Sequence, residues 1–189
     1  MDGPYGAGNQ DWGNYETCIM IGAGIGVTPY ASILLDAVHA MNGNGYSDAI
    51  CKKIYFVWIC PTYKHYDWFV EVLRKAEEAD HKNTLEMHVF VTQYFHKYDL
   101  RTTMLYICEK HFRVQQGCSM FTNLKATNHF GRPNVSPLLR YFRDRHQKIE
   151  RIGVFSCGPR SVNKSVHEAC DEVNSDRKVP HLVHKYETF

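Results

Sequence analysis

The sequence predicts an α/β fold, with a mostly parallel sheet of five or six strands and helices on both faces. Short, nearly continuous apolar runs, typical of strands buried on both faces, alternate with segments whose apolar residues recur at helical spacing. The first apolar run passes directly into a glycine-rich turn and then a helix. Such alternation is typical of a parallel sheet whose strands are joined by helical crossovers.

The elements follow in order from these patterns. The expected strands are residues 18–22, 53–60, 85–92, 151–159 and 180–186. The segment 151–159 ends in a turn. The expected helices are residues 29–41, 65–79, 100–112, 137–146 and about 161–173. Residues 124–132 are interpreted as an irregular lead into the helix near 137–146.

The helix at 100–112 allows two interpretations. Its apolar stripe is either a packed face or part of a family-specific insertion; the stripe contains Met104, Leu105, Ile107 and Cys108.

Composition narrows the class of protein. The 189 residues, 44% of them hydrophobic and 22% charged, suit one globular domain. A net charge of +2 without a basic stripe argues against nucleic acid as a partner. No apolar run approaches the ~18 residues of a membrane span, and no signal peptide opens the chain.

Cysteine and histidine usage favours reduced thiols in the cytosol and no metal site. The seven cysteines contain no C-x-x-C pair. His181 and His184 lie three apart on an expected strand, so they should point to opposite faces. The glycosylation sequons at Asn134 and Asn163 are expected to be silent.

The turn at residues 22–29 is the centre of the predicted site. Its three glycines let the backbone approach a ligand, and the helix that follows offers unpaired N–H groups suited to a phosphate. Pro29 fits the first helical turn. The turn departs from the usual G-x-G-x-x-G fingerprint because Val27 replaces a glycine and the next strand ends without a carboxylate. A tight turn without a ligand is the alternative.

Ligands in parallel sheets sit outside the carboxyl ends of the strands. Four segments fall at such ends, so they are expected to meet at one edge, with Gly24 and Cys157 lining one crevice. The segments are residues 22–29, 60–64, 92–94 and 157–159. Such a site needs no acid–base pair when a cofactor carries the hydride chemistry.

Several motifs together resemble one family. The motifs, in chain order, are residues 2–6 (DGPYG), 22–29 (GAGIGVTP), 129–133 (HFGRP), 154–159 (VFSCGP) and 186–189 (YETF). The G-x-G-x-G-x-x-P spacing within residues 22–29 is similar to the nicotinamide-binding lobe of ferredoxin–NADP reductases. The full set resembles the C-terminal NADPH-binding lobe of the NADPH oxidases, most like the dual oxidases. Residues 98–109 and 51–56 resemble the dual oxidases in particular.

The resemblance implies roles for individual residues. It implies that Cys157 helps to aim the nicotinamide hydride at a flavin, and that Phe189 stacks on that flavin until the nicotinamide displaces it. The expected cofactor-binding residues are Gly22, Ala23, Gly24, Ile25, Gly26, Val27, Thr28, Pro29, Cys60, Lys64, Arg132, Gly158 and Pro159.

One position departs from the family pattern. Pro61 stands where these oxidases usually have an arginine that reads the 2′-phosphate of NADPH. Lys64 and Arg132 are the nearest cations that could replace it, and Arg132 could instead pair with a carboxylate of the protein.

The resemblance also implies the surroundings of the chain. Residues 1–16 are expected to be an inter-domain segment from the end of a missing FAD-binding domain, and residues 17–189 the NADPH-binding domain. The expected partners are the FAD-binding and transmembrane haem domains of the same chain, with oxygen as final acceptor. A calcium-binding regulatory region and a maturation factor are further possibilities. The domain would then lie at the cytosolic face of a membrane, as the tail of a multi-pass protein, and the isolated fragment should not turn over.

Two alternative functions stay open at this point. They are a soluble flavin-dependent nicotinamide reductase of a cytochrome or ferredoxin, and a redox-silent regulatory module.

Overall fold

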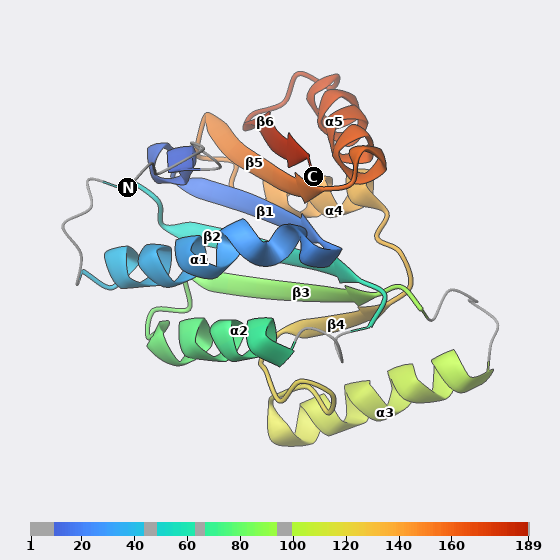
Figure 1. Cartoon of the computed structure of the whole chain (residues 1–189). Coiled ribbons are helices and arrows are strands. Elements are labelled where there is room, and N and C mark those ends of the chain that lie inside the picture. Colours follow the sequence, from blue (N-terminus) through green and yellow to red (C-terminus); the bar gives the residue numbers. More distant parts are fainter. Residues whose placement is uncertain (1–9, 44–48, 63–66, 94–99, 189) are drawn as a thin grey trace, which may run out of the picture.

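The computed structural model describes residues 10–43, 49–62, 67–93 and 100–188. Six parallel strands form one sheet in the order β4-β3-β2-β1-β5-β6 (Figure 1). The strands are β1 (Thr17–Ala23), β2 (Lys53–Cys60), β3 (Leu85–Val91), β4 (Thr127–Phe130), β5 (Arg151–Gly158) and β6 (His181–Thr188). The predicted fold class is confirmed.

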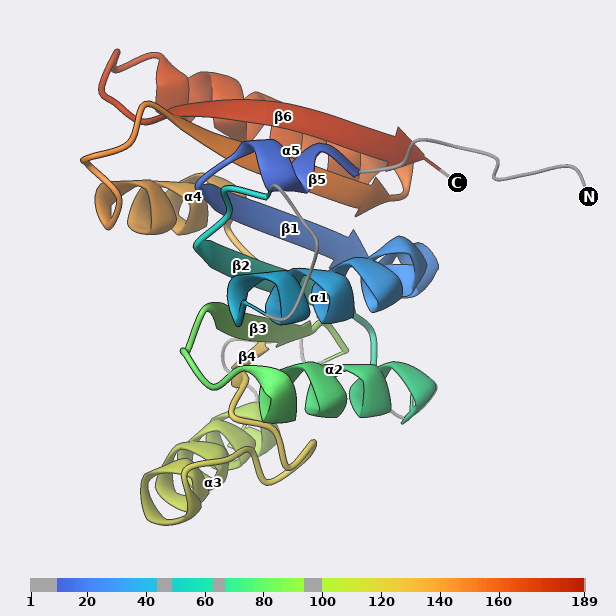
Figure 2. The same cartoon turned by 90° about the vertical axis from the view of Figure 1, so that its left-hand side faces the viewer.

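Helices cover both faces of this sheet (Figure 2). In the described chain they are α1 (Thr28–Met41), α2 (Asp67–Ala79), α3 (Leu100–Gln116), α4 (Val135–Asp144) and α5 (Arg160–Asn174). Two short 3₁₀ helices, η1 (Gln10–Asn14) and η2 (Gly24–Val27), precede β1 and α1. The predicted helices at 29–41, 65–79, 137–146 and 161–173 correspond to α1, α2, α4 and α5, with small shifts at their ends.

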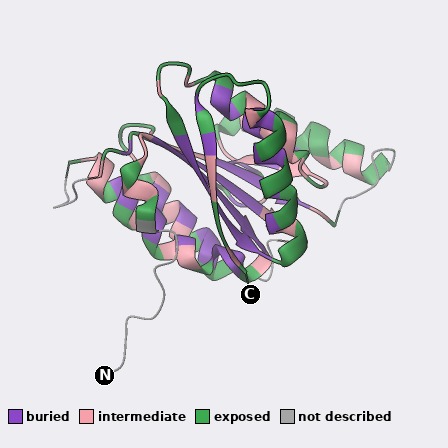
Figure 3. Cartoon of the chain, turned by 90° about the horizontal axis from the view of Figure 1, so that it is seen from above, coloured by how far each residue is buried: buried purple, intermediate pink, exposed green. Residues whose placement is uncertain are grey.

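The strands of the sheet are largely buried between the helices (Figure 3). The two-residue alternation of their side chains divides the core between the two faces. Cys18 and Met20 of β1 pack with α1 and α2, whereas Ile19 and Ile21 pack with α4 and α5. Every residue of β1 is buried, as expected for a central strand of a parallel sheet. The apolar runs of the sequence therefore reflect helices on both sides.

The short edge strand β4 was not predicted. It contains four residues, Thr127 to Phe130, and pairs with β3 from His88↔Thr127 to Val91↔Phe130. Three of its four residues are polar, and the strand is too short to show a clear period. Pairing with β3, rather than local sequence preference, makes it a strand.

Helix α3 lies beyond β4 at the edge of the molecule (Figures 1 and 2). The interpretation of its apolar stripe as a packed face is wrong, because Met104 is 56% exposed, Ile107 is 59% exposed and Cys108 is also exposed. Its buried residue is Glu109, whose carboxylate accepts hydrogen bonds from the Met120 N–H (2.9 Å) and Asn128 Nδ2 (3.0 Å). Polar contacts therefore help attach this helix to the domain.

The described residues that precede β1, 10–16, contact the folded unit. Ile50 N–H donates to the Gly13 carbonyl at 2.9 Å, and Trp12 packs against the α1-side core. Across the described segments, none of the helices combines the length and apolar character needed to cross a membrane.

Candidate functional site

The turn between β1 and α1 forms the first wall of the site. β1 ends at Ala23, Gly24 adopts a φ of +57°, and η2 runs directly into α1. Thr28 Oγ1 donates to the Ile25 carbonyl at 2.7 Å. Neither η2 nor α1 has a side-chain cap at its start, and Pro29 occupies the first turn of α1. The turn thus presents uncapped backbone N–H groups where an anion binds well.

Close packing fixes this turn against the sheet. A Cβ on Gly22 would lie 2.7 Å from Val27 Cγ1, and Val27 is fully buried. A Cβ on Gly158, at the end of β5, would lie 2.8 Å from the Ala23 Cβ. Glycine at position 22 therefore lets η2 pack closely onto β1, and glycine at position 158 lets the end of β5 approach the end of β1.

The ends of β2 and β3 form a second wall. The Thr92 N–H donates to the Cys60 carbonyl at 2.8 Å, and the Gln93 N–H donates to the Pro61 carbonyl at 3.1 Å. The Cys60 side chain is buried, and burial raises the pKa of its thiol to about 12. Cys60 is therefore a neutral thiol. Pro61, which follows it, is exposed.

The link between β4 and α4 brings Arg132 to the same edge. Gly131 donates its N–H to the Val91 carbonyl at 3.0 Å and adopts a φ of +106°. This turn carries the exposed Arg132 past the end of β3 toward α4.

These segments enclose a cavity of about 490 Å³ at the carboxyl edge of the sheet. The chain runs from β1 outward to β4 and then returns to β5 beside β1, so the cavity lies at the topological switch point, where parallel sheets bind ligands. Its lining residues come from every strand-end segment named above, together with the starts of α4 and α5. They are Ala23, Gly24, Ile25, Ile59, Cys60, Pro61, Thr92, Arg132, Pro133, Val135, Pro159, Ser161, Val162 and Ser165.

Residues 15–171 match the model of the ferric reductase NAD binding domain. The chain belongs to this family. The cavity at the switch point is thus the candidate dinucleotide site of a NAD-binding domain, and the ligand-free interpretation of the β1–α1 turn is disfavoured.

The domain is similar over its whole length to dual oxidases. Identity is 57% with the dual oxidase of Drosophila melanogaster, 53% with dual oxidase 1 of Caenorhabditis elegans and 44% with human dual oxidase 2. All of the chain is matched, but it spans only 12–13% of the length of these relatives. Among solved structures, a ferredoxin–NADP⁺ reductase from Plasmodium falciparum gives a TM-score of 0.48 at 12% identity, over 98% of this chain and 59% of that one.

The structure separates the predicted site residues into three groups. Those that line the cavity are Ala23, Gly24, Ile25, Cys60, Arg132 and Pro159. Those that shape its walls from outside the lining are Gly22, Gly26, Val27, Thr28, Pro29, Cys157 and Gly158. Lys64 and Phe189 lie outside the described residues, as does the motif at residues 2–6.

Cys157 of this NAD-binding domain lies at the edge of the cavity rather than on its lining. It is opposite Gly22 in the β1–β5 register, 5% exposed, and part of the core on the α1 side. Burial, with a smaller contribution from the Glu187 charge, raises the pKa of its thiol. The thiol is therefore neutral at ordinary pH, and its neighbour Pro159 is the residue that reaches the cavity.

Sequence reasoning missed a buried amide that ties the site together. Asn163 of α5 is 4% exposed, and its Nδ2 donates to the carbonyls of Gly158 (3.1 Å) and Glu187 (2.7 Å). Its Oδ1 accepts from Ser156 Oγ at 2.8 Å, and Ser156 Oγ also lies 2.8 Å from His184 Nε2. Asn163 therefore joins the end of β5 to the end of β6. The amide is fully used, so Asn163 is not available to carry a glycan.

A signal for Asn163 was present in the sequence. Residue 163 precedes Val166 and Cys170 at helical spacing, so it continues the apolar stripe of α5. A polar residue on such a stripe must find buried partners. The cavity residues on α4 and α5, including Ser161 and Ser165, were also missed, because they belong to none of the motifs that indicate nucleotide binding.

Proposed function

We propose that this chain is the NADPH-binding lobe of a dual-oxidase-type NADPH oxidase. In the full protein it would deliver hydride to FAD, and electrons would then pass through haems to oxygen to give hydrogen peroxide or superoxide. The 57% identity with a dual oxidase supports the family assignment, and the dual oxidase relatives support a longer chain that supplies the FAD and haem domains. On this proposal the lobe lies at the cytosolic face of a membrane.

The observation that carries the proposal is the cavity where four strand-end segments and the Arg132 turn converge. Among its described lining residues, Arg132 is the one with a charged side chain, so the lining carries a positive charge and no carboxylate. That balance suits a ligand with several phosphates.

Each wall then has a role toward the dinucleotide. Bound NADPH supplies the hydride, so the protein needs to position it rather than to transfer protons. The uncapped start of η2 and α1 would hold the pyrophosphate, and Arg132 would face the 2′-phosphate. Gly158 and Pro159 would set the position of the nicotinamide, and Cys157, which is opposite Gly22 in the β1–β5 register, directly precedes them in the chain.

A coupled assay tests this proposal against its alternatives. The chain, joined to the FAD-binding domain of a dual oxidase relative, is mixed with NADPH without oxygen, and loss of flavin absorbance is followed. We expect rapid flavin reduction by the fusion, and binding without turnover by the isolated chain. Gly24→Val is the matched control, because a branched residue is strained at a φ of +57° and should block the turn.

The outcomes separate the three functions. NADPH binding without flavin reduction in the fusion would favour the redox-silent module. An isolated chain that carries FAD and consumes NADPH would favour a self-contained flavin reductase and contradict the proposal.

A further inference from the structure

We propose that Cys18 and Cys51 are a site of reversible disulfide formation, closed by hydrogen peroxide. Their Sγ atoms lie 3.8 Å apart, and the two side chains are 0% and 5% exposed. All seven cysteines are free thiols, and the Cys51 thiol donates a hydrogen bond to Cys18 Sγ in the core. The proposal does not rest on the proposed function, because the oxidant is supplied in the test.

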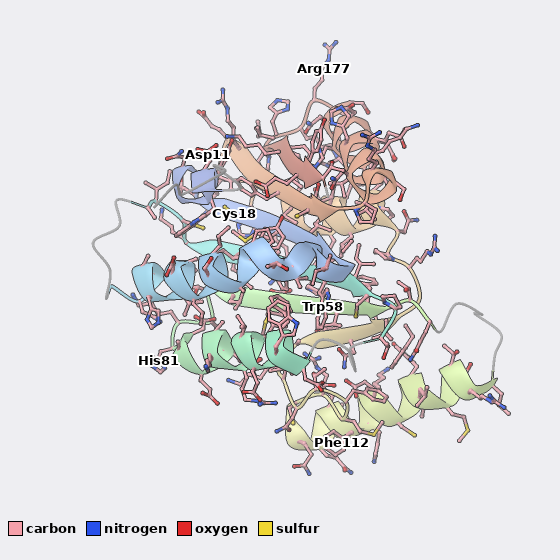
Figure 4. The ribbon with its side chains drawn as sticks, viewed as in Figure 1. Asp11, Cys18, Trp58, His81, Phe112 and Arg177 are labelled. Atoms are coloured by element: carbon pink, nitrogen blue, oxygen red, sulfur yellow. The ribbon has the colours of Figure 1, made fainter. Side chains whose placement is uncertain are left out.

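The two thiols come from separate segments that meet at the start of the sheet. Cys18 lies on β1 (Figure 4), and Cys51 lies two residues before β2. Cys18 Sγ donates to the Trp12 carbonyl at 3.1 Å, and Cys51 Sγ contacts the Lys53 carbonyl at 3.6 Å. A disulfide requires the sulfurs to close to ~2.05 Å. Cys51 lies two residues before β2, between Ile50 and Lys52, whose N–H groups donate to the Gly13 and Glu16 carbonyls, so its side chain must supply much of this movement.

An oxidant can reach one of the two sulfurs. Cys51 lines a second cavity, of about 430 Å³, between the end of α1 and the segment before β2. Its lining includes the charged Glu16 and Lys52, which suit a small polar molecule. Cys18 is fully buried behind Cys51. Cys51 is therefore the cysteine that hydrogen peroxide oxidises first, and Cys18 is the one that then forms the disulfide with it.

The pKa shifts of the two thiols also indicate that Cys51 reacts before Cys18. The hydrogen bond between the two sulfurs lowers the pKa of Cys51 and raises that of Cys18, so Cys51 is the first to form a thiolate. The Cys51 thiolate attacks one peroxide oxygen, the O–O bond breaks, and hydroxide leaves, giving the sulfenic acid. The Cys18 thiol then attacks that sulfur and expels water. In total, two thiols and one peroxide give one disulfide and two waters.

The disulfide would close a loop of the chain that contains the β1–α1 turn of the nucleotide site, and it would stabilise that loop. Residues 18–51 contain β1 without its first residue, the turn at Gly24–Val27 and α1. Linking their two ends restricts the unfolded chain and stabilises this unit. The oxidised protein should therefore unfold at a higher temperature, by roughly 4–12 °C for a domain of this size.

Peptide mapping of the native chain tests the proposal. The chain is treated with hydrogen peroxide, its remaining thiols are alkylated under denaturing conditions, and linked peptides are identified by mass. We expect one linked peptide joining residues 18 and 51, two hydrogens lighter than the separate peptides and released by dithiothreitol. Cys170, buried in the α5-side core, should stay reduced.

Two variants sharpen the result. Cys18→Ser should leave Cys51 as a sulfenic acid that a dimedone probe captures, whereas Cys170→Ser should form the Cys18–Cys51 link like the wild type. The proposal is overturned if exposed Cys108 oxidises while Cys18 and Cys51 stay reduced, or if the two link only after the chain is unfolded. Mapping of the wild type decides the matter even if a variant fails to fold.

Discussion

On the β1–β5 side of the cavity, which we term the packed side, backbone positions are fixed by buried contacts of Gly22, Gly158 and Asn163. On the β2–β4 side, which we term the exposed side, the cavity is lined by the exposed Pro61 and Arg132. The packed side would hold the parts that NADPH and NADH share, and the exposed side would meet the 2′-phosphate that distinguishes them. The difference suggests that nucleotide binding depends on the stability of the fold, whereas nucleotide choice does not.

The largest effect is expected at Gly22. Gly22→Ala places a Cβ 2.7 Å from Val27 Cγ1 and 3.4 Å from Tyr30 Cδ2. Overpacking of this kind should lower the free energy of unfolding by about 3 kcal/mol and weaken binding of both nucleotides. Urea unfolding and calorimetry measure the two effects.

A second substitution tests the cause. Gly22→Ala combined with Val27→Ala removes the clashing atoms, so the two changes should be less harmful together than the sum of each alone. Additive losses would show that the Gly22–Val27 contact does not fix the turn.

The next effect is expected at Asn163. Asn163→Ala leaves the carbonyls of Gly158 and Glu187 and the Ser156 hydroxyl without this partner, which should cost about 2 kcal/mol of unfolding free energy and weaken nucleotide binding. Asn174→Ala is the matched control. Asn174 ties the same helix to the other end of β6, through bonds of 2.9 Å to the N–H and the carbonyl of Leu182.

Comparison of the two asparagine variants distinguishes positioning of the Gly158 turn from an effect on the stability of the whole domain. Asn174→Ala should destabilise the domain without changing nucleotide affinity under folding conditions. If both variants lower affinity equally, Asn163 acts through general stability and does not position the Gly158 turn.

A smaller, pH-dependent effect is expected at His184. Burial, with the nearby His167, lowers the pKa of His184 to about 4, whereas an unfolded histidine titrates near ~6.5. Between these values the unfolded chain binds more protons, so the stability of the domain should fall as pH drops from about 6.5 toward 4. Urea midpoints at pH 7 and pH 5 should differ less in His184→Gln than in the wild type. Equal differences would contradict a neutral His184 in the Ser156 network.

The same contrast explains how far the sequence could predict this molecule. Five strands and their helices were predictable, because burial on both faces leaves long apolar runs such as residues 53–60. β4 was not, because four residues paired with a neighbouring strand carry too little pattern of their own. The exposed Met104 and Ile107 of α3 show the opposite limit, since a helical stripe in sequence does not reveal what covers it.

The sequence likewise predicted some residues of the site and missed others. Motifs located the turn at residues 22–29, the end of β5 and Arg132, because glycine, proline and a lone cation leave local signals. Asn163 and the serines of α5 were missed, because their roles depend on tertiary neighbours far away in the chain. Lys64 and Phe189 stay predictions.

The most direct test of the division between the two sides is calorimetry of NADPH and NADH on Arg132→Ala, with Arg151→Ala as control. Arg151 is an exposed arginine at the start of β5, the end of that strand opposite to the cavity. Lys64→Ala, measured alongside, tests the second predicted cation. A charge-assisted hydrogen bond contributes ~1.5–3 kcal/mol, and 1.4 kcal/mol is about tenfold in affinity. We expect Arg132→Ala to lose at least about tenfold in NADPH affinity, with NADH affinity unchanged. Equal losses for both nucleotides, or a loss matched by Arg151→Ala, would contradict a separate exposed side that reads the 2′-phosphate.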